Sequence, residues 1–123
     1  MLYTKAFLAG NKNHEIKSIS HITGGGLIEN PPRAFNSNLS IKFDMKNYKL
    51  PPLFKWLQSK ANISLFELAK TFNCGIGLLI FVNKKDKETV MTNLNEAGYN
   101  SFIIGRMTEN ISNRSVLFDG WEL

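Results

Sequence analysis

The sequence predicts an α+β fold, in which a mixed sheet is packed by helices. Segments with the apolar spacing of helices alternate with short strand-like segments, and glycine or proline clusters separate them. The 123 residues are 43% hydrophobic and 20% charged, a composition typical of globular proteins and unlike that of disordered chains. A chain of this length builds one core, so we expect a single domain over residues 1–123.

The first third of the chain predicts a helix, a strand and a corner. The helix covers residues 2–12, and the strand covers residues 17–23 and runs into a glycine triplet. Residues 27–35 begin as a helical turn, but Pro31 and Pro32 follow. Proline lacks a backbone donor and disfavours the helical conformation in the residue before it. We therefore expect a rigid corner in which Asn30 and Pro31 are extended.

The middle of the chain predicts a strand at residues 40–44, where polar and apolar residues alternate, and then two helices. The first helix starts at the proline pair 51–52 and ends near residue 59. The second starts at a capping box formed by Ser64 and Glu67 and runs to residue 72. We expect their aromatic residues in the core, namely Phe54, Trp56, Phe66 and Phe72.

The last part of the chain predicts three strands and a covering helix. Residues 75–82 are almost continuously apolar, which is typical of a central strand that is covered on both faces. Asn83 is the expected cap of a helix that packs through Val90, Leu94 and Ala97 and ends at Gly98. Two more strands are expected at residues 101–106 and 115–118.

Composition also excludes several classes of function. The net charge of +5 invites a nucleic-acid interpretation, but the lysines are scattered, and no aromatic residues interleave with the one cluster at residues 84–88. No apolar run is long enough for a membrane helix. The single cysteine, Cys74, permits no internal disulfide and no cysteine metal pair. It is expected in the core, and a reducing cytoplasm is the expected location.

The first candidate site is the segment that contains the glycine triplet. Successive glycine amides can bind an anion, and the missing β-carbons let a ligand approach the main chain. The nearby side chains add a titratable imidazole, a hydroxyl, an acceptor, an amide and a planar cation. These residues are His21, Thr23, Gly24, Gly25, Gly26, Glu29, Asn30 and Arg33. The alternative is an ordinary glycine turn with solvated polar neighbours.

The second candidate site is the segment 71–77, where a helix stops and the apolar strand begins. Gly75 and Gly77 permit close approach of a ligand to the backbone. The alternative is a tight helix-to-strand connection with Asn73 near the left-handed conformation.

The two segments together resemble the C-terminal domain of aminoimidazole ribonucleotide synthetases. The strings that carry the resemblance are residues 21–27, Glu29 with Asn30, Pro32 with Arg33, the proline pair 51–52 with residues 56–58, and residues 71–77. The similarity covers roughly residues 3–107, and the combination is more specific than any one motif. Pro31 departs from the family, which has an aliphatic residue there.

The resemblance implies a substrate-side domain of an ATP-dependent cyclo-ligase of purine biosynthesis. Such an enzyme converts formylglycinamidine ribonucleotide to aminoimidazole ribonucleotide with release of ADP and phosphate. It implies that His21 is catalytic, and that Thr23, Gly24, Gly25, Gly26, Glu29, Asn30, Arg33, Asn73, Gly75 and Gly77 bind substrate or phosphate. No metal ligand is expected here. ATP and Mg²⁺ belong to a homodimeric complete enzyme whose N-terminal domain is absent from this chain.

A domain without its ATP-binding half is expected to be inactive alone. The alternative function is a non-catalytic ribonucleotide-binding or regulatory module that reuses the fold.

Overall fold

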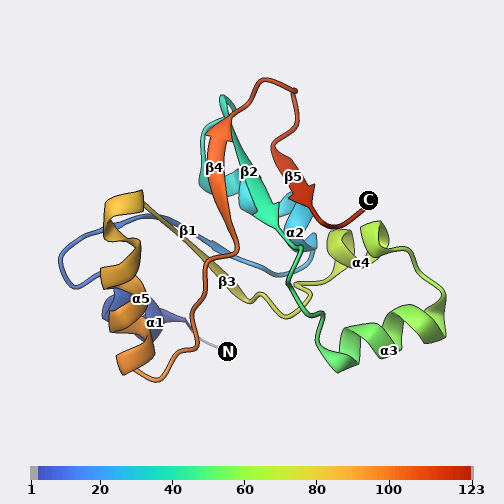
Figure 1. The fold of residues 1–123 in the computed structure, drawn as a ribbon, viewed down its shortest axis with the longest axis horizontal. Coiled ribbons are helices and arrows are strands. Elements are labelled where there is room, and N and C mark those ends of the chain that lie inside the picture. Colours follow the sequence, from blue (N-terminus) through green and yellow to red (C-terminus); the bar gives the residue numbers. More distant parts are fainter. Residues whose placement is uncertain (1–2, 123) are drawn as a thin grey trace. The chain divides into compact units, whose positions relative to one another are not determined.

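A computed structural model describes residues 3–122 of the chain (Figure 1). The described residues form two compact units, one of residues 3–19 and 80–103 and the other of residues 20–79 and 104–122. The division falls within strands β1 (Ile16–His21) and β3 (Leu78–Val82), which pair in a two-stranded sheet. Helices and mixed strands together confirm the predicted α+β class.

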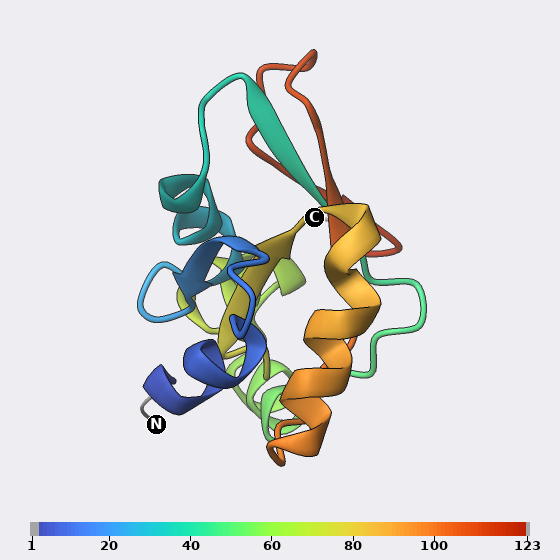
Figure 2. The same cartoon turned by 90° about the vertical axis from the view of Figure 1, so that its left-hand side faces the viewer.

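The first unit is built on two helices, α1 (Thr4–Gly10) and α5 (Lys87–Glu96), which pack on each other (Figure 2). Ala6, Val90 and Leu94 are buried between them, which confirms two of the three predicted contact residues of α5. Ala97 is exposed, because α5 ends one residue before it. Helix α1 is shorter than predicted, and Leu2 lies outside the described residues.

Helix α5 begins and ends by different means. The predicted cap at Asn83 is wrong, because its side chain makes no capping hydrogen bond. Instead its carbonyl accepts from the amide of Asp86 at 3.0 Å, which starts the 3₁₀ turn η2 (Lys84–Asp86) before α5. The predicted end is confirmed: Gly98 has φ +88°, and the amide of Tyr99 donates to the carbonyl of Leu94 at 3.0 Å.

The second unit contains a three-stranded mixed sheet. Strand β2 (Leu39–Asp44) lies between β4 (Gly105–Glu109), which is antiparallel to it, and β5 (Val116–Asp119), which is parallel (Figure 1). The predicted strand at 101–106 is wrong in its bounds. The Ser101 hydroxyl donates to the Asn95 side chain at 2.9 Å, so this residue is tied to the end of α5 and the ladder starts only at Gly105.

An aromatic row, of which Phe43 is the fully buried member, packs beside this sheet. The ring of the fully buried Phe43 stacks on Phe118 at 5.1 Å, and Phe118 stacks on Trp121 at 6.0 Å. Trp121 in turn lies 6.2 Å from Tyr48. Aromatic pairs at such distances add to the stability that their burial provides. The row therefore connects β2 and β5 to the segment after β2.

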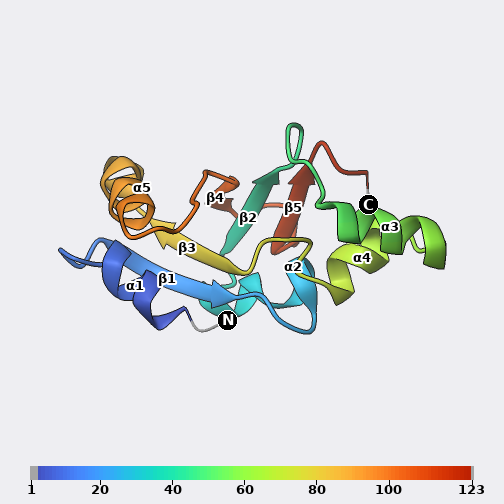
Figure 3. The same cartoon turned by 90° about the horizontal axis from the view of Figure 1, so that it is seen from below.

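Four short helical elements complete the second unit (Figure 3). They are α2 (Gly26–Glu29), the 3₁₀ turn η1 (Pro31–Ala34), α3 (Pro52–Ala61) and α4 (Leu65–Thr71). The predicted extended conformation of Asn30 is wrong, because it is helical, with φ −75° and ψ −47°. The capping box of α4 is half formed: the Ser64 hydroxyl accepts from the Glu67 amide at 3.1 Å, with no reciprocal bond from the Glu67 side chain among the described residues.

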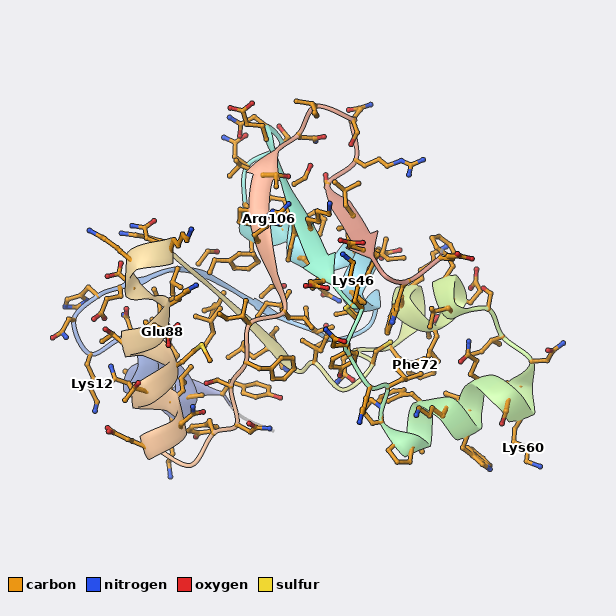
Figure 4. All side chains as sticks on the ribbon, viewed as in Figure 1. Lys12, Lys46, Lys60, Phe72, Glu88 and Arg106 are labelled. Atoms are coloured by element: carbon orange, nitrogen blue, oxygen red, sulfur yellow. The ribbon has the colours of Figure 1, made fainter. Side chains whose placement is uncertain are left out.

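The aromatic residues of α3 and α4 divide into two groups. Phe54 and Phe72 pack on each other at 6.1 Å, where α4 faces α3 (Figure 4). Trp56 is 57% exposed and Phe66 is 41% exposed, so the prediction that all four lie in the core is wrong for these two. No residue of α3 is buried, and its main neighbour among the described elements is α4.

Strand β3 is also less central than predicted. It begins at Leu78 rather than at residue 75, and within residues 3–122 it pairs with β1 alone. Leu79 is buried, but the other four residues of β3 are half-buried. Within the apolar run 75–82, Ile76 and Leu79 are buried, but the run does not determine how many strands flank it.

Candidate functional site

The first candidate loop begins where β1 ends. His21 is the last residue of β1 and is exposed, and the buried Ile22 follows it. The chain then turns tightly, because the amide of Gly26 donates to the carbonyl of Thr23 at 3.0 Å. His21 and Thr23 are both exposed beside this turn.

The three glycines of the turn have different surroundings. A β-carbon added to Gly24 would meet nothing within 4 Å, so this glycine is open to a ligand. Gly25 has φ +96°, a left-handed conformation that favours glycine, and it precedes α2. Gly26 has φ +56°, and a β-carbon there would lie 2.1 Å from the carbonyl oxygen of Ala69 in α4. Gly26 therefore permits helix packing, and its amide is already used.

Asn30 holds this loop from inside. Its side chain is 4% exposed, and its Nδ2 donates to the carbonyls of Thr23 at 3.2 Å, Gly24 at 3.1 Å and Gly26 at 3.0 Å. Its Oδ1 accepts a longer bond of 3.4 Å from the Thr23 hydroxyl. The predicted site residue Asn30 is thus next to the predicted glycines, but its amide is directed to the protein backbone.

Glu29 and Arg33 lie on either side of Asn30, and both are exposed. The Glu29 side chain lies over Gly25, because a β-carbon on Gly25 would be 2.9 Å from Glu29 Oε2. Arg33 lies in the helical turn η1, one residue before its end, and its guanidinium forms no ion pair with any residue of the described chain. The loop therefore presents the Glu29 carboxylate close to the glycines. It also presents the Arg33 guanidinium, which is not paired with a carboxylate of the described chain.

The second candidate loop connects α4 to β3. The predicted left-handed residue is not Asn73 but Cys74, which has φ +54°, followed by Gly75 with φ +93°. The Asn73 side chain stabilises this turn, because its Oδ1 accepts from the Gly75 amide at 2.9 Å. Gly77 precedes β3 and accepts a hydrogen bond from the other loop.

Tyr48 supports the second loop, and the sequence analysis did not single it out. Its hydroxyl donates to the carbonyl of Cys74 at 2.8 Å, and a β-carbon on Gly75 would lie 2.9 Å from the same hydroxyl oxygen. Burial raises the pKa of Tyr48. Burial also raises the pKa of the Cys74 thiol to about 11, which makes it an inert core thiol as expected. A tyrosine before a proline pair carries no sequence signal for such a contact.

Two contacts bring the two candidate loops together. The amide of Ile22 donates to the carbonyl of Gly77 at 3.0 Å, and Gly26 packs on the carbonyls of Ala69 and Phe72 at the end of α4. Both loops belong to the same compact unit. Two segments about 50 residues apart in the sequence are therefore adjacent in the fold.

The described residues contain no group of three or more His, Cys, Asp or Glu side chains that could hold a metal ion. The backbone amides of the loops and the Arg33 guanidinium are groups that can bind an anionic ligand. Among residues 3–122, no helix is long and apolar enough to cross a membrane.

The sequence of the chain is similar to known proteins. Residues 1–117 match the family model described as AIR synthase related protein, C-terminal domain. The chain is 41% identical over 108 residues to the phosphoribosylformylglycinamidine cyclo-ligase of Neisseria meningitidis serogroup C, an alignment that covers 88% of this chain and 31% of that relative. The chain thus spans about a third of the length of this relative. Since the family model matches nearly all of its residues, the chain belongs to the AIR synthase related proteins, of which it contains the C-terminal domain.

Proposed function

We propose that this chain is the substrate-side domain of a cyclo-ligase that converts formylglycinamidine ribonucleotide to aminoimidazole ribonucleotide. The observation that carries the proposal is the junction of the two candidate loops through Ile22 and Gly77. These loops contain the strings that resemble the family. Their junction leaves His21, Thr23 and Gly24 exposed together at the end of β1.

The reaction requires an oxygen to leave a formyl carbon. An amide oxygen is a poor leaving group, so in the proposed reaction it first takes the terminal phosphoryl group of ATP, and ADP is released. An amidine nitrogen of the substrate then forms the new C–N bond, and phosphate departs with the former formyl oxygen. Charge on phosphoryl oxygens develops during both steps and needs fixed hydrogen-bond donors.

The residues of the first loop can meet these demands. The amides of Gly24 and Gly25 make no hydrogen bond with any described residue, so they are free to bind a phosphoryl group or the ribonucleotide phosphate. Arg33 adds a planar cation that suits two phosphate oxygens. His21 exchanges a proton with the attacking nitrogen or the formyl group, and Thr23 and Glu29 are placed to bind polar groups of the substrate.

The residues of the second loop support this surface. We propose that Asn73, Gly75 and Gly77 form its far edge, with Gly75 fixed by Tyr48 and by the Asn73 side chain. Gly26 contributes through packing rather than through its amide, which the Thr23 carbonyl accepts.

The remaining partners lie outside this chain. We assign ATP and Mg²⁺ to the N-terminal domain of the complete enzyme, because this chain spans only 31% of the length of the meningococcal relative. We place the complete enzyme in the cytoplasm as a homodimer. No step of the mechanism is assigned to a metal held by this domain.

The proposal is tested in a hybrid cyclo-ligase, in which this chain replaces the matching segment of the meningococcal relative. In this hybrid, His21→Asn is expected to lower kcat by about 10² to 10⁴ for ATP-dependent formation of aminoimidazole ribonucleotide, because a proton-transfer group is lost. The control is His14→Asn, since His14 is exposed in a turn with φ +61°, which asparagine also adopts. Equal kcat in the two variants would remove His21 from the mechanism.

A further inference from the structure

Asn30 is a buried polar side chain that the proposed chemistry does not use directly. Three backbone carbonyls, those of Thr23, Gly24 and Gly26, accept hydrogen bonds from its single Nδ2. An amide group has only two N–H hydrogens, so at least one of them is shared between two carbonyls. The burial and the number of acceptors show that Asn30 fixes the path of the glycine loop.

The consequence for the loop follows from the geometry of the peptide bond. In a planar trans peptide, the carbonyl of one residue and the amide of the next point in opposite directions. Asn30 draws the carbonyls of Thr23 and Gly24 inward. The amides in the same two peptide planes belong to Gly24 and Gly25, and they are therefore turned away from Asn30.

These two amides are the ones without a hydrogen-bond partner among the described residues, whereas the Gly26 amide is bound to Thr23. Gly24 is exposed, and its Cα faces open space. The donors that Asn30 orients are thus the same donors that a bound phosphoryl group would need. A mere packing role would not require the side chain to contact two consecutive peptide planes.

We propose that Asn30 is a positioning residue, which orients the amides of Gly24 and Gly25 toward an anionic group of the substrate. This inference rests on the proposed function, because that function supplies the phosphorylated ligand. It assigns to Asn30 an indirect role in place of direct contact with substrate. The hydrogen bonds of Asn30 also hold it in a helical conformation, although proline follows it.

The first test uses the unmodified 123-residue chain and measures exchange of side-chain amide hydrogens by NMR. The Asn30 hydrogens are buried and bound to three carbonyls, so they are expected to exchange with water at least tenfold more slowly than those of Asn47. Asn47 is exposed, and its side chain makes no hydrogen bond with a described residue. Equal exchange rates would contradict the hydrogen-bonded position of Asn30, whatever the chain binds.

The second test uses Asn30→Asp, which exchanges one NH₂ group for an oxygen at nearly constant volume. The carboxylate would face three carbonyl oxygens, so we expect kcat/KM of the hybrid cyclo-ligase to fall by about tenfold to hundredfold at pH 8. Asn47→Asp makes the same chemical change at an exposed position and is expected to leave kcat/KM within twofold. Amide resonances of Gly24 and Gly25 are expected to shift in Asn30→Asp and not in Asn47→Asp.

The pH profile separates positioning from general damage to the fold. A buried carboxyl that faces carbonyls has a raised pKa, and its protonated form regains one donor. The ratio of Asn30→Asp to wild-type kcat/KM is therefore expected to rise as the pH falls from 8 to 6. The charged residues on the elements around position 30 are all exposed and common to both proteins, so the ratio cancels their titration; they are Glu29, Arg33, Glu67 and Lys70.

Three outcomes are distinguishable. If the wild-type hybrid forms no product, the proposed function fails, while the exchange measurement still decides the geometry of Asn30. If the wild-type hybrid is active and Asn30→Asp matches Asn47→Asp in kcat/KM and in pH profile, the positioning role is wrong and the function stands. If Asn30→Asp does not fold, unchanged Gly24 and Gly25 amide resonances in Asn30→Ser, which keeps a shorter donor, would likewise overturn the proposal.

Discussion

At the scale of single residues, the three adjacent glycines of the triplet have different structural roles. Gly24 is open, Gly25 supplies a left-handed conformation, and Gly26 lets α2 approach the end of α4. The proposed chemistry uses Gly24 and Gly25, and the fold requires Gly26. Substitution of each should therefore affect a different property.

Substitution of Gly26 and Gly24 by alanine tests this division. Gly26→Ala places a β-carbon 2.1 Å from the Ala69 carbonyl oxygen at a residue with φ +56°. We expect a loss of about 2–5 kcal/mol in unfolding free energy, from steric overlap and the left-handed backbone together. Gly24→Ala is the matched control, and it should change the unfolding free energy by less than about 0.5 kcal/mol. Urea unfolding of both variants measures this, and similar losses would contradict the assignment.

The buried thiol of Cys74 gives a prediction about pH. The pKa of Cys74 is raised to about 11 in the folded chain, whereas an unfolded cysteine titrates near 8.5. Above about pH 8.5, Cys74 loses its proton in the unfolded chain but keeps it in the folded chain. The unfolding free energy therefore falls as the pH rises from about 9 to about 11. Chemical unfolding at pH 8 and pH 10.5 is expected to show a smaller decrease in Cys74→Ala. An equal decrease in both proteins would exclude Cys74 as a cause.

The sequence predicted which residues gather at the site better than it predicted what each does. The glycine triplet and its polar neighbours were identifiable because they are contiguous in the chain. The inward direction of the Asn30 amide was not, because it depends on carbonyls that face it only after α2 and η1 form. The exposure of Trp56 was missed for a related reason, since the sequence does not show which elements pack on α3.

At the scale of elements, the ends of helices and strands are set by particular side chains. Ser64 caps α4 by accepting from the Glu67 amide, and Gly98 ends α5 in a left-handed conformation, both as predicted. Strand β4 starts later than the apolar residues before it suggest, because the Ser101 hydroxyl donates a hydrogen bond to Asn95 near the end of α5. Local signals thus located the helix ends well, whereas the strand bounds depended on long-range contacts that sequence does not show.

The cap of α4 matters for the site, because the end of α4 supports Gly26. Ser64→Ala removes the one side-chain acceptor at the start of this helix and is expected to lower the unfolding free energy by about 1 kcal/mol. Ser112→Ala is the control, since Ser112 is exposed and makes no side-chain hydrogen bond with a described residue. Its effect should stay within about 0.5 kcal/mol. Thermal unfolding of the two variants tests this prediction. Equal unfolding midpoints for Ser64→Ala and Ser112→Ala would show that the cap is not needed.

At the scale of the whole molecule, the site belongs to one compact unit and the helices α1 and α5 to the other. The family model matches residues 1–117, so both units belong to the conserved plan. The meningococcal relative is about three times as long as the aligned segment, which covers 31% of that relative. In the proposed function, the complete reaction therefore needs a second part of the protein, and this domain contributes one wall of the proposed site.

The formation of aminoimidazole ribonucleotide by the hybrid cyclo-ligase tests the central claim most directly. The hybrid and the meningococcal enzyme are compared with formylglycinamidine ribonucleotide and ATP, and product is followed with and without ATP. We predict ATP-dependent turnover within about tenfold of the meningococcal enzyme, because the two loops supply the same surface to the substrate. A folded hybrid that binds the ribonucleotide without forming product would contradict the claim and identify the domain as a non-catalytic binding module.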